Sequence, residues 1–150
     1  MIKIFIFSTF LFQSSMASVF FNTATRTETT IEEVATTLSD DAVVVLGEYH
    51  SMPKIQTAEG EIIRKVVKAK KLESNFTVGW EFLDYTDQIN ISNLYEVYKI
   101  NKIDEMTLLN GLYPNVKDVN YYAPYLEFFK ASKELDGQVI GLNAPRSMKR

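Results

Sequence analysis

Three short apolar runs alternate along the chain with segments of helical periodicity, and this alternation restricts the possible folds strongly. The first run, residues 42–46, has no polar interruption, which is typical of a strand buried on both faces inside a parallel sheet. Residues 76–82 and 139–142 form the second and third runs. A strand, a helix and another strand at this spacing form a βαβ unit, whose crossover is right-handed in nearly all proteins. The sequence therefore predicts an α/β fold, a three-layer sandwich with a mainly parallel sheet.

Helix starts and ends are marked between these runs. Thr30 and Glu33 have the spacing of a capping box, which predicts a short helix to about residue 38. Pro53 begins a second helix, whose basic carboxyl end we interpret as a solvated, dipole-compensated helix end. A broken helical pattern over residues 85–109 and another helix ending at Gly137 complete the predicted elements.

Composition bounds the size and the chemistry. The chain has 150 residues, of which 46% are hydrophobic, enough for one modest core. Sixteen basic against nineteen acidic residues give a net charge of −3, so nothing favours nucleic acid as a partner. The absence of cysteine excludes disulfides, thiolate metal sites, cysteine nucleophiles and a lipid-anchor cysteine. Any catalysis must come from the single histidine, carboxylates, hydroxyls or a bound cofactor.

The amino terminus has the layout of a secretory signal. Lys3 precedes the apolar stretch 4–12, and Ser15 and Ala17 are the small residues expected before a cleavage site. The alternative is a buried strand, but the stretch is too short to span a bilayer as a helix of about 20 residues and stands apart from the rest. We expect residues 1–17 to be a cleavable signal peptide that directs a secreted or periplasmic protein. Residues 18–29 are predicted to be a polar lead-in, and residues 30–150 the α/β domain, incomplete at its carboxyl end.

Polar residues follow each predicted strand. Glu48 and His50 come after the first, Glu81 lies near the end of the second, and Asn143 and Arg146 follow the third. Ligands of parallel α/β sheets gather beyond the carboxyl ends of the strands, so we expect these residues to converge. Their spacing in an extended chain directs Glu48 and His50 to one side, where they can act as base and orienter or as two metal ligands.

Structural interpretations of the same residues stay open. Glu81 follows apolar neighbours, so its carboxylate would be partly desolvated unless it is paired. A salt bridge between Glu81 and Arg146 would simply join two strand ends. His50 alone could be a helix-entry residue that bonds to local backbone.

These residues resemble those of a known family. Residues 43–50 with their Gly-Glu-x-His, the Trp-Glu-Phe of residues 80–82, Tyr125 with its helix, and residues 140–146 with their Asn-Ala-Pro-Arg look like the amino-terminal half of a ChaN-like domain. This is the haem-binding uptake group of the Tiki and erythromycin-esterase superfamily, and the resemblance covers about residues 30–150. It implies that Glu48, His50, Glu81 and Asn143 match the polar site of the superfamily.

The sequence also departs from the family pattern. The pattern usually has further histidines shortly after Gly-Glu-x-His, where residues 54–56 are Lys, Ile and Gln. The second Gly-x-x-His of the pattern lies in the carboxyl-terminal half of the domain. We therefore expect this chain to match only the first part of a larger domain.

The resemblance implies an extracytoplasmic protein that binds haem or iron for uptake, with His50, Glu48, Glu81, Asn143 and Arg146 as candidate cofactor-binding residues. The alternative is a metal-dependent hydrolase, a protease or esterase, in which Glu48, His50 and Glu81 are metal ligands or catalytic groups around Mn²⁺ or Zn²⁺. A truncated, inactive domain is the third hypothesis. The candidate partners are haem or an iron complex, a membrane-associated uptake receptor, and a second copy of the chain in a homodimer.

Overall fold

The computed structural model describes residues 20–50, 52–145 and 148, and it divides into two units at residue 30. In the first unit, β1 (Phe20–Asn22) and β2 (Thr27–Thr29) form an antiparallel hairpin. The Asn22 side chain caps the turn, because its Oδ1 accepts the backbone N–H groups of Ala24 and Thr25. The predicted polar lead-in therefore contains a hairpin, whereas the predicted signal peptide lies outside the described residues.

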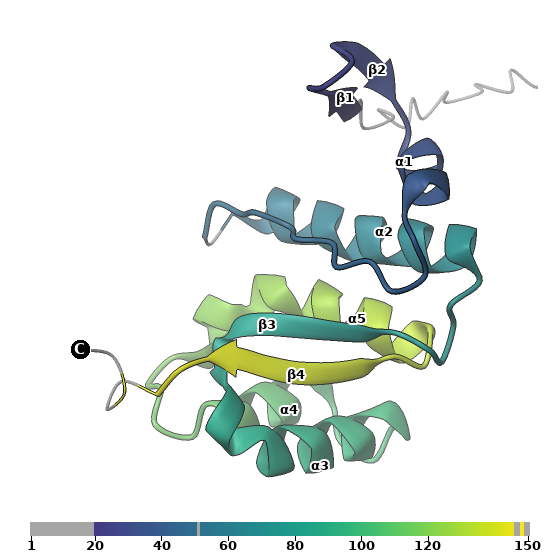
Figure 1. The fold of residues 1–150 in the computed structure, drawn as a ribbon. Helices are drawn as coiled ribbons and strands as arrows, with labels where there is room; N and C mark the ends of the chain where they lie inside the picture. The colour runs from purple at the N-terminus through teal and green to yellow at the C-terminus, as the bar shows by residue number, and fades with distance from the viewer. Residues whose placement is uncertain (1–19, 51, 146–147, 149–150) are drawn as a thin grey trace, which may run out of the picture. The chain divides into compact units, whose positions relative to one another are not determined.

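The second unit alternates helices with two strands (Figure 1). Its elements are α1 (Ile31–Thr37), α2 (Pro53–Lys70), β3 (Thr77–Asp84), the 3₁₀ helix η1 (Tyr85–Asp87), α3 (Gln88–Lys99), α4 (Glu105–Leu112), the 3₁₀ helix η2 (Val119–Tyr125), α5 (Leu126–Glu134) and β4 (Gln138–Asn143). The predicted helices and the second and third predicted strands are thus confirmed, and so is the α/β class.

The sheet of this unit pairs β3 with β4 in parallel. Thr77 lies opposite Gln138, and the register continues to Trp80 opposite Gly141. It then shifts, so that Asp84 lies opposite Asn143. The carboxyl ends of the two strands therefore meet at one edge of the sheet, as the sequence predicts.

The first predicted strand, residues 42–46, is wrong for the described structure. The segment has no regular secondary structure, and Val43 and Val45 are 87% and 85% exposed. A strand requires a hydrogen-bonded neighbour, and the structure gives β3 only β4 as its partner. Leu46 alone packs inward, against a small core that includes Val67 and Val78.

The main core covers one face of the sheet. Trp80 on β3 packs against the rings of Tyr125 in η2 and of Phe128 and Phe129 in α5. On the other face, Leu142 of β4 is 57% exposed. Within the described residues, this face of the two-stranded sheet is therefore partly open at Leu142.

The helix ends follow the chemistry of their residues. Pro53 occupies the first turn of α2, where the missing N–H costs little. Asp104 accepts the N–H of Thr107 at the start of α4. The prediction for α5 was wrong in one detail, because Asp136, with φ 57°, adopts the left-handed conformation, and Gly137 follows it and donates its N–H to Ser132.

None of the helices in the described part of the chain combines the length and the apolar composition that a bilayer crossing needs.

Candidate functional site

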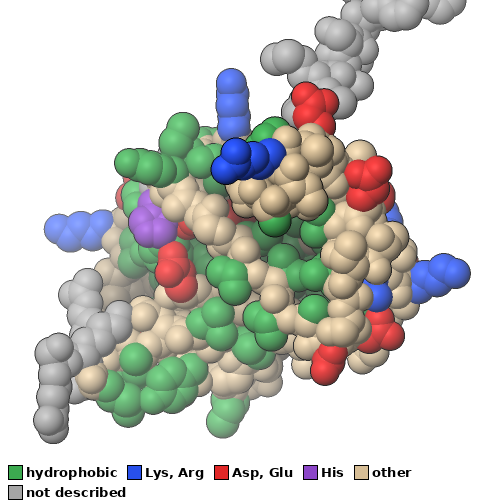
Figure 2. All heavy atoms as spheres, turned by 45° about the horizontal axis from the view of Figure 1, so that its top comes forward, with side chains coloured by type: hydrophobic (Ala, Val, Ile, Leu, Met, Phe, Trp, Pro, Cys, Tyr) green, Lys and Arg blue, Asp and Glu red, His purple; other side chains and the backbone are tan. Residues whose placement is uncertain are grey.

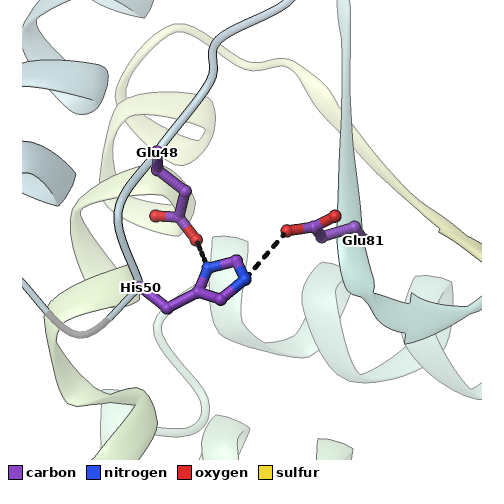
Figure 3. Close-up of side chains that lie close together, drawn as sticks. All are labelled: Glu48, His50 and Glu81. Atoms are coloured by element: carbon purple, nitrogen blue, oxygen red, sulfur yellow. Dashed lines mark hydrogen bonds and ion pairs between the residues drawn. The ribbon is translucent and has the colours of Figure 1, made fainter.

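Glu48, His50 and Glu81 come together in the structure as predicted (Figure 3). His50 Nδ1 lies 2.7 Å from Glu48 Oε1, and His50 Nε2 lies 3.8 Å from Glu81 Oε1. One ligand atom from each of the three side chains lies within 4.8 Å of the others. The histidine ring therefore stands between two carboxylates that come from distant parts of the sequence.

Two elements supply these side chains. Glu48 and His50 lie in the irregular segment that leads into α2, and Glu81 lies on β3. The imidazole ring of His50 packs edge-on against Phe82, with the ring centres 5.0 Å apart. Tyr49, between the two site residues, is 77% exposed.

Glu81 is more exposed than the sequence indicated. Its side chain is 62% exposed, whereas its apolar neighbours predicted a partly desolvated carboxylate. The reason is strand alternation, since Trp80 is buried and Glu81 therefore points to the opposite, open side of β3.

Glu48, in contrast, is enclosed by residues that the sequence analysis did not assign to the site. Its side chain is only 10% exposed. Gln56 on α2 donates Nε2 to Glu48 Oε2 at 2.6 Å, and the Tyr125 hydroxyl donates to Glu48 Oε1 at 3.0 Å. Gln56 itself is 1% exposed, and its Oε1 has no partner among the described residues.

Glu59, also on α2, is the third residue that sequence reasoning missed. Its pKa is raised from 4.5 to about 7, first by burial and then by the nearby Glu48 and Glu81 carboxylates. Gln56 and Glu59 are three residues apart and so share one face of the helix. The spacing of Gln56 and Glu59 near the start of a helix was the sequence feature that could have indicated their place at the site.

The two remaining candidates lie at the end of β4. Asn143 is its last residue and stands opposite Asp84, at the carboxyl edge of the sheet. Arg146 lies outside the described residues, so its pairing with Glu81 stays a prediction.

The arrangement suits ligand binding through nitrogen and oxygen. With Nδ1 bonded to a carboxylate, the Nε2 atom of His50 is the nitrogen free to bind a metal centre. Glu81 offers an exposed oxygen beside that nitrogen. In Figure 2 the one histidine lies at the surface with hydrophobic side chains beside it.

Comparison with known proteins identifies the family of this chain. The sequence model of the family described as "Haem-binding uptake, Tiki superfamily, ChaN" matches residues 34–150. Searches of curated proteins and of solved structures gave no match. The match covers most of the sequence and includes Glu48, His50, Glu81 and Asn143, and the chain therefore belongs to the ChaN family of haem-binding uptake proteins in the Tiki superfamily.

Proposed function

We propose that the chain binds haem or an iron complex outside the cytoplasm and serves its uptake, with His50 Nε2 as the axial ligand. The observation that carries this proposal is the 2.7 Å contact between His50 Nδ1 and Glu48. A carboxylate on one ring nitrogen fixes the orientation of the ring and makes the other nitrogen a stronger donor to a metal. Family membership supports haem as the ligand class.

The surroundings of His50 fit this ligand. Haem iron accepts an axial donor from histidine, tyrosine, methionine or cysteine within apolar and aromatic surroundings. His50 is the only histidine and cysteine is absent from the sequence. Phe82 packs against the ring, and Tyr49 and Met52 expose further hydrophobic surface near it along the chain. Bound haem would supply the iron, while the chain supplies the axial nitrogen and its orientation.

The test is a titration of the full chain with haemin, followed by the Soret absorption. We expect haemin to give a shifted Soret band with the wild type. His50→Ala should lower the affinity for haemin by about 10-fold or more. Added imidazole should restore the band in His50→Gly, because it fills the space of the lost ring. Asn110→Ala, an exposed change on α4, is the control and should leave binding unchanged. A band unaffected by His50→Ala would exclude His50 as the ligand.

The extracytoplasmic location has its own test. Expression of the full sequence followed by mass spectrometry of the mature protein should show an amino terminus near Ser18. Retention of residues 1–17 would contradict a cleavable signal.

A metal-dependent hydrolase is the second candidate, and the ligand atoms within 4.8 Å of one another favour it. An oxygen-rich site with one imidazole suits Mn²⁺ or Zn²⁺ and leaves a position for water. Titration calorimetry with each ion decides this candidate, because a chain that binds neither ion cannot use this chemistry.

The proposed partners have separate tests. Sedimentation with and without haemin tests the homodimer, and capture by membrane proteins in the presence of haemin tests an uptake receptor.

A further inference from the structure

We infer that Gln56 and Tyr125 are positioning residues for His50. They hold Glu48 as the acceptor of the His50 Nδ1–H, so that Nε2 carries the free electron pair. Glu48 thus acts through the histidine. The use of that electron pair for iron rests on the proposed function, whereas the orientation of the imidazole does not.

Both carboxylate oxygens of Glu48 accept hydrogen bonds. Oε1 lies 2.7 Å from His50 Nδ1 and 3.0 Å from the Tyr125 hydroxyl. Oε2 accepts the Gln56 amide at 2.6 Å. A carboxylate has about four acceptor positions, and these three contacts occupy three of them. Both oxygens of Glu48 are therefore engaged in hydrogen bonds, and Oε1 is shared between His50 and Tyr125.

The two positioning residues are themselves held firmly. Gln56 is 1% exposed on α2, and its Nε2 also lies 3.4 Å from the Tyr49 carbonyl oxygen. Turning the amide over would place its oxygen against two other oxygens. Tyr125 is 2% exposed, and its ring packs against those of Trp80 and Phe82 at 5.0 and 5.3 Å.

Glu48 is held by residues that lie outside its own segment. It lies in a stretch without regular secondary structure, eight residues before Gln56 and 77 before Tyr125. Its position therefore depends on donors from α2 and η2. Because an ionised carboxylate only accepts hydrogen bonds, a neutral His50 must carry its proton on Nδ1. Histidine free in water favours the other form, with the proton on Nε2, so the protonated nitrogen reports whether Glu48 is in place.

The experiment uses the single histidine. In the ¹⁵N-labelled full chain, long-range ¹H–¹⁵N correlation spectra contain imidazole signals from His50 alone. At a pH where the ring is neutral, we expect the Nδ1–H form in the wild type. Gln56→Leu and Tyr125→Phe should each shift the population toward Nε2–H. Tyr113→Phe is the matched control, because its hydroxyl donates to the Phe82 carbonyl and should leave the Nδ1–H form intact.

Tyr125→Phe removes one oxygen and keeps the ring, so the inference stays testable if Gln56→Leu fails to fold. An Nε2–H form in the wild type, or no change in Tyr125→Phe, would overturn the inference.

A second measurement connects the inference to haem. With haemin bound, Tyr125→Phe should raise the reduction potential of the iron and lower the iron–histidine stretching frequency, since Glu48 is then no longer held in position to accept from Nδ1–H. Tyr113→Phe should change neither, whereas a purely structural role for Tyr125 would predict no change in either variant. If the Nδ1–H form is present but haemin does not bind, the proposed function is wrong and the positioning of His50 stands.

Discussion

Gln88 Oε1 accepts the backbone N–H of Gly141 at 2.9 Å. The same side chain donates Nε2 to the carbonyl oxygen of Val139 at 3.0 Å. These are the two groups of β4 that a peptide of a neighbouring parallel strand would bind. A side chain at the start of α3 thus completes the outer edge of the strand.

Removing this amide leaves two backbone groups of β4 without their partner. We expect Gln88→Ala to lower the free energy of unfolding by about 1 to 3 kcal/mol, measured by urea denaturation. Asn90→Ala, which removes a surface bond to Asp87, is the control, with an expected change within about 0.5 kcal/mol. Equal effects of the two changes would show that the edge is satisfied without Gln88.

Alanine substitutions at two strand glycines are expected to differ in their effect on stability. A Cβ on Gly141 would lie 2.7 Å from the carbonyl oxygen of Leu83, where only backbone could move. A Cβ on Gly79 would meet the side chain of Leu142, which is exposed and can rotate away. Urea denaturation should therefore show that Gly141→Ala destabilises by about 1 to 3 kcal/mol and Gly79→Ala by less than about 0.5 kcal/mol. The reverse order would contradict the close approach of β4 to the end of β3.

The fold was predictable where one segment determines its own structure. Pro53 and the helical spacing after it located α2, and Val139 in a short apolar run located β4. The strand prediction for residues 42–46 was wrong because a strand depends on a partner that its own sequence does not specify. The end of α5 was predicted at Gly137, whereas the left-handed residue that ends the helix is Asp136, which also binds Lys99.

The site was predictable from the apolar runs but not from the helices, although the first of these runs is not a strand in the structure. Glu48, His50 and Glu81 follow apolar runs, and this position alone brought them together in the prediction. Gln56 and Tyr125 lie on helices whose orientation toward Glu48 depends on the packing of the whole unit. Helical periodicity gives the buried face of a helix, but not which distant residue that face meets.

Asp136 links stability to pH. The Lys99 ammonium at 2.6 Å and the Ser74 hydroxyl lower the pKa of its carboxyl below 3.8. The native state therefore binds fewer protons at this group than the unfolded chain, so its contribution is present above pH 3.8 and is lost as the pH falls through the lowered pKa. Asn tolerates the left-handed backbone, so Asp136→Asn tests the charge alone.

We expect Asp136→Asn to lower Tm slightly at pH 7, with the difference from the wild type shrinking toward pH 3. Circular dichroism melting curves at both values measure this. In a Lys99→Met background the same change should have a smaller effect at pH 7, because the ion pair is already absent. A Tm difference that is constant with pH would show that the carboxylate charge does not contribute.

Glu81 separates the two candidate ligands of the site. A divalent cation between His50 Nε2 and Glu81 Oε1, which are 3.8 Å apart, needs the carboxylate as a charged ligand. Haem iron needs only the nitrogen, and an exposed carboxylate beside it contributes less than about 1 kcal/mol. Glu81→Gln should therefore weaken Mn²⁺ binding by about 10-fold or more and change haemin affinity by less than about 5-fold. Calorimetry and the Soret titration measure the two affinities, and His50→Ala, which should weaken both, shows that each assay reports this site. If Glu81→Gln abolished haemin binding, the iron would depend on an oxygen ligand from β3, and His50 would not be the sole axial donor.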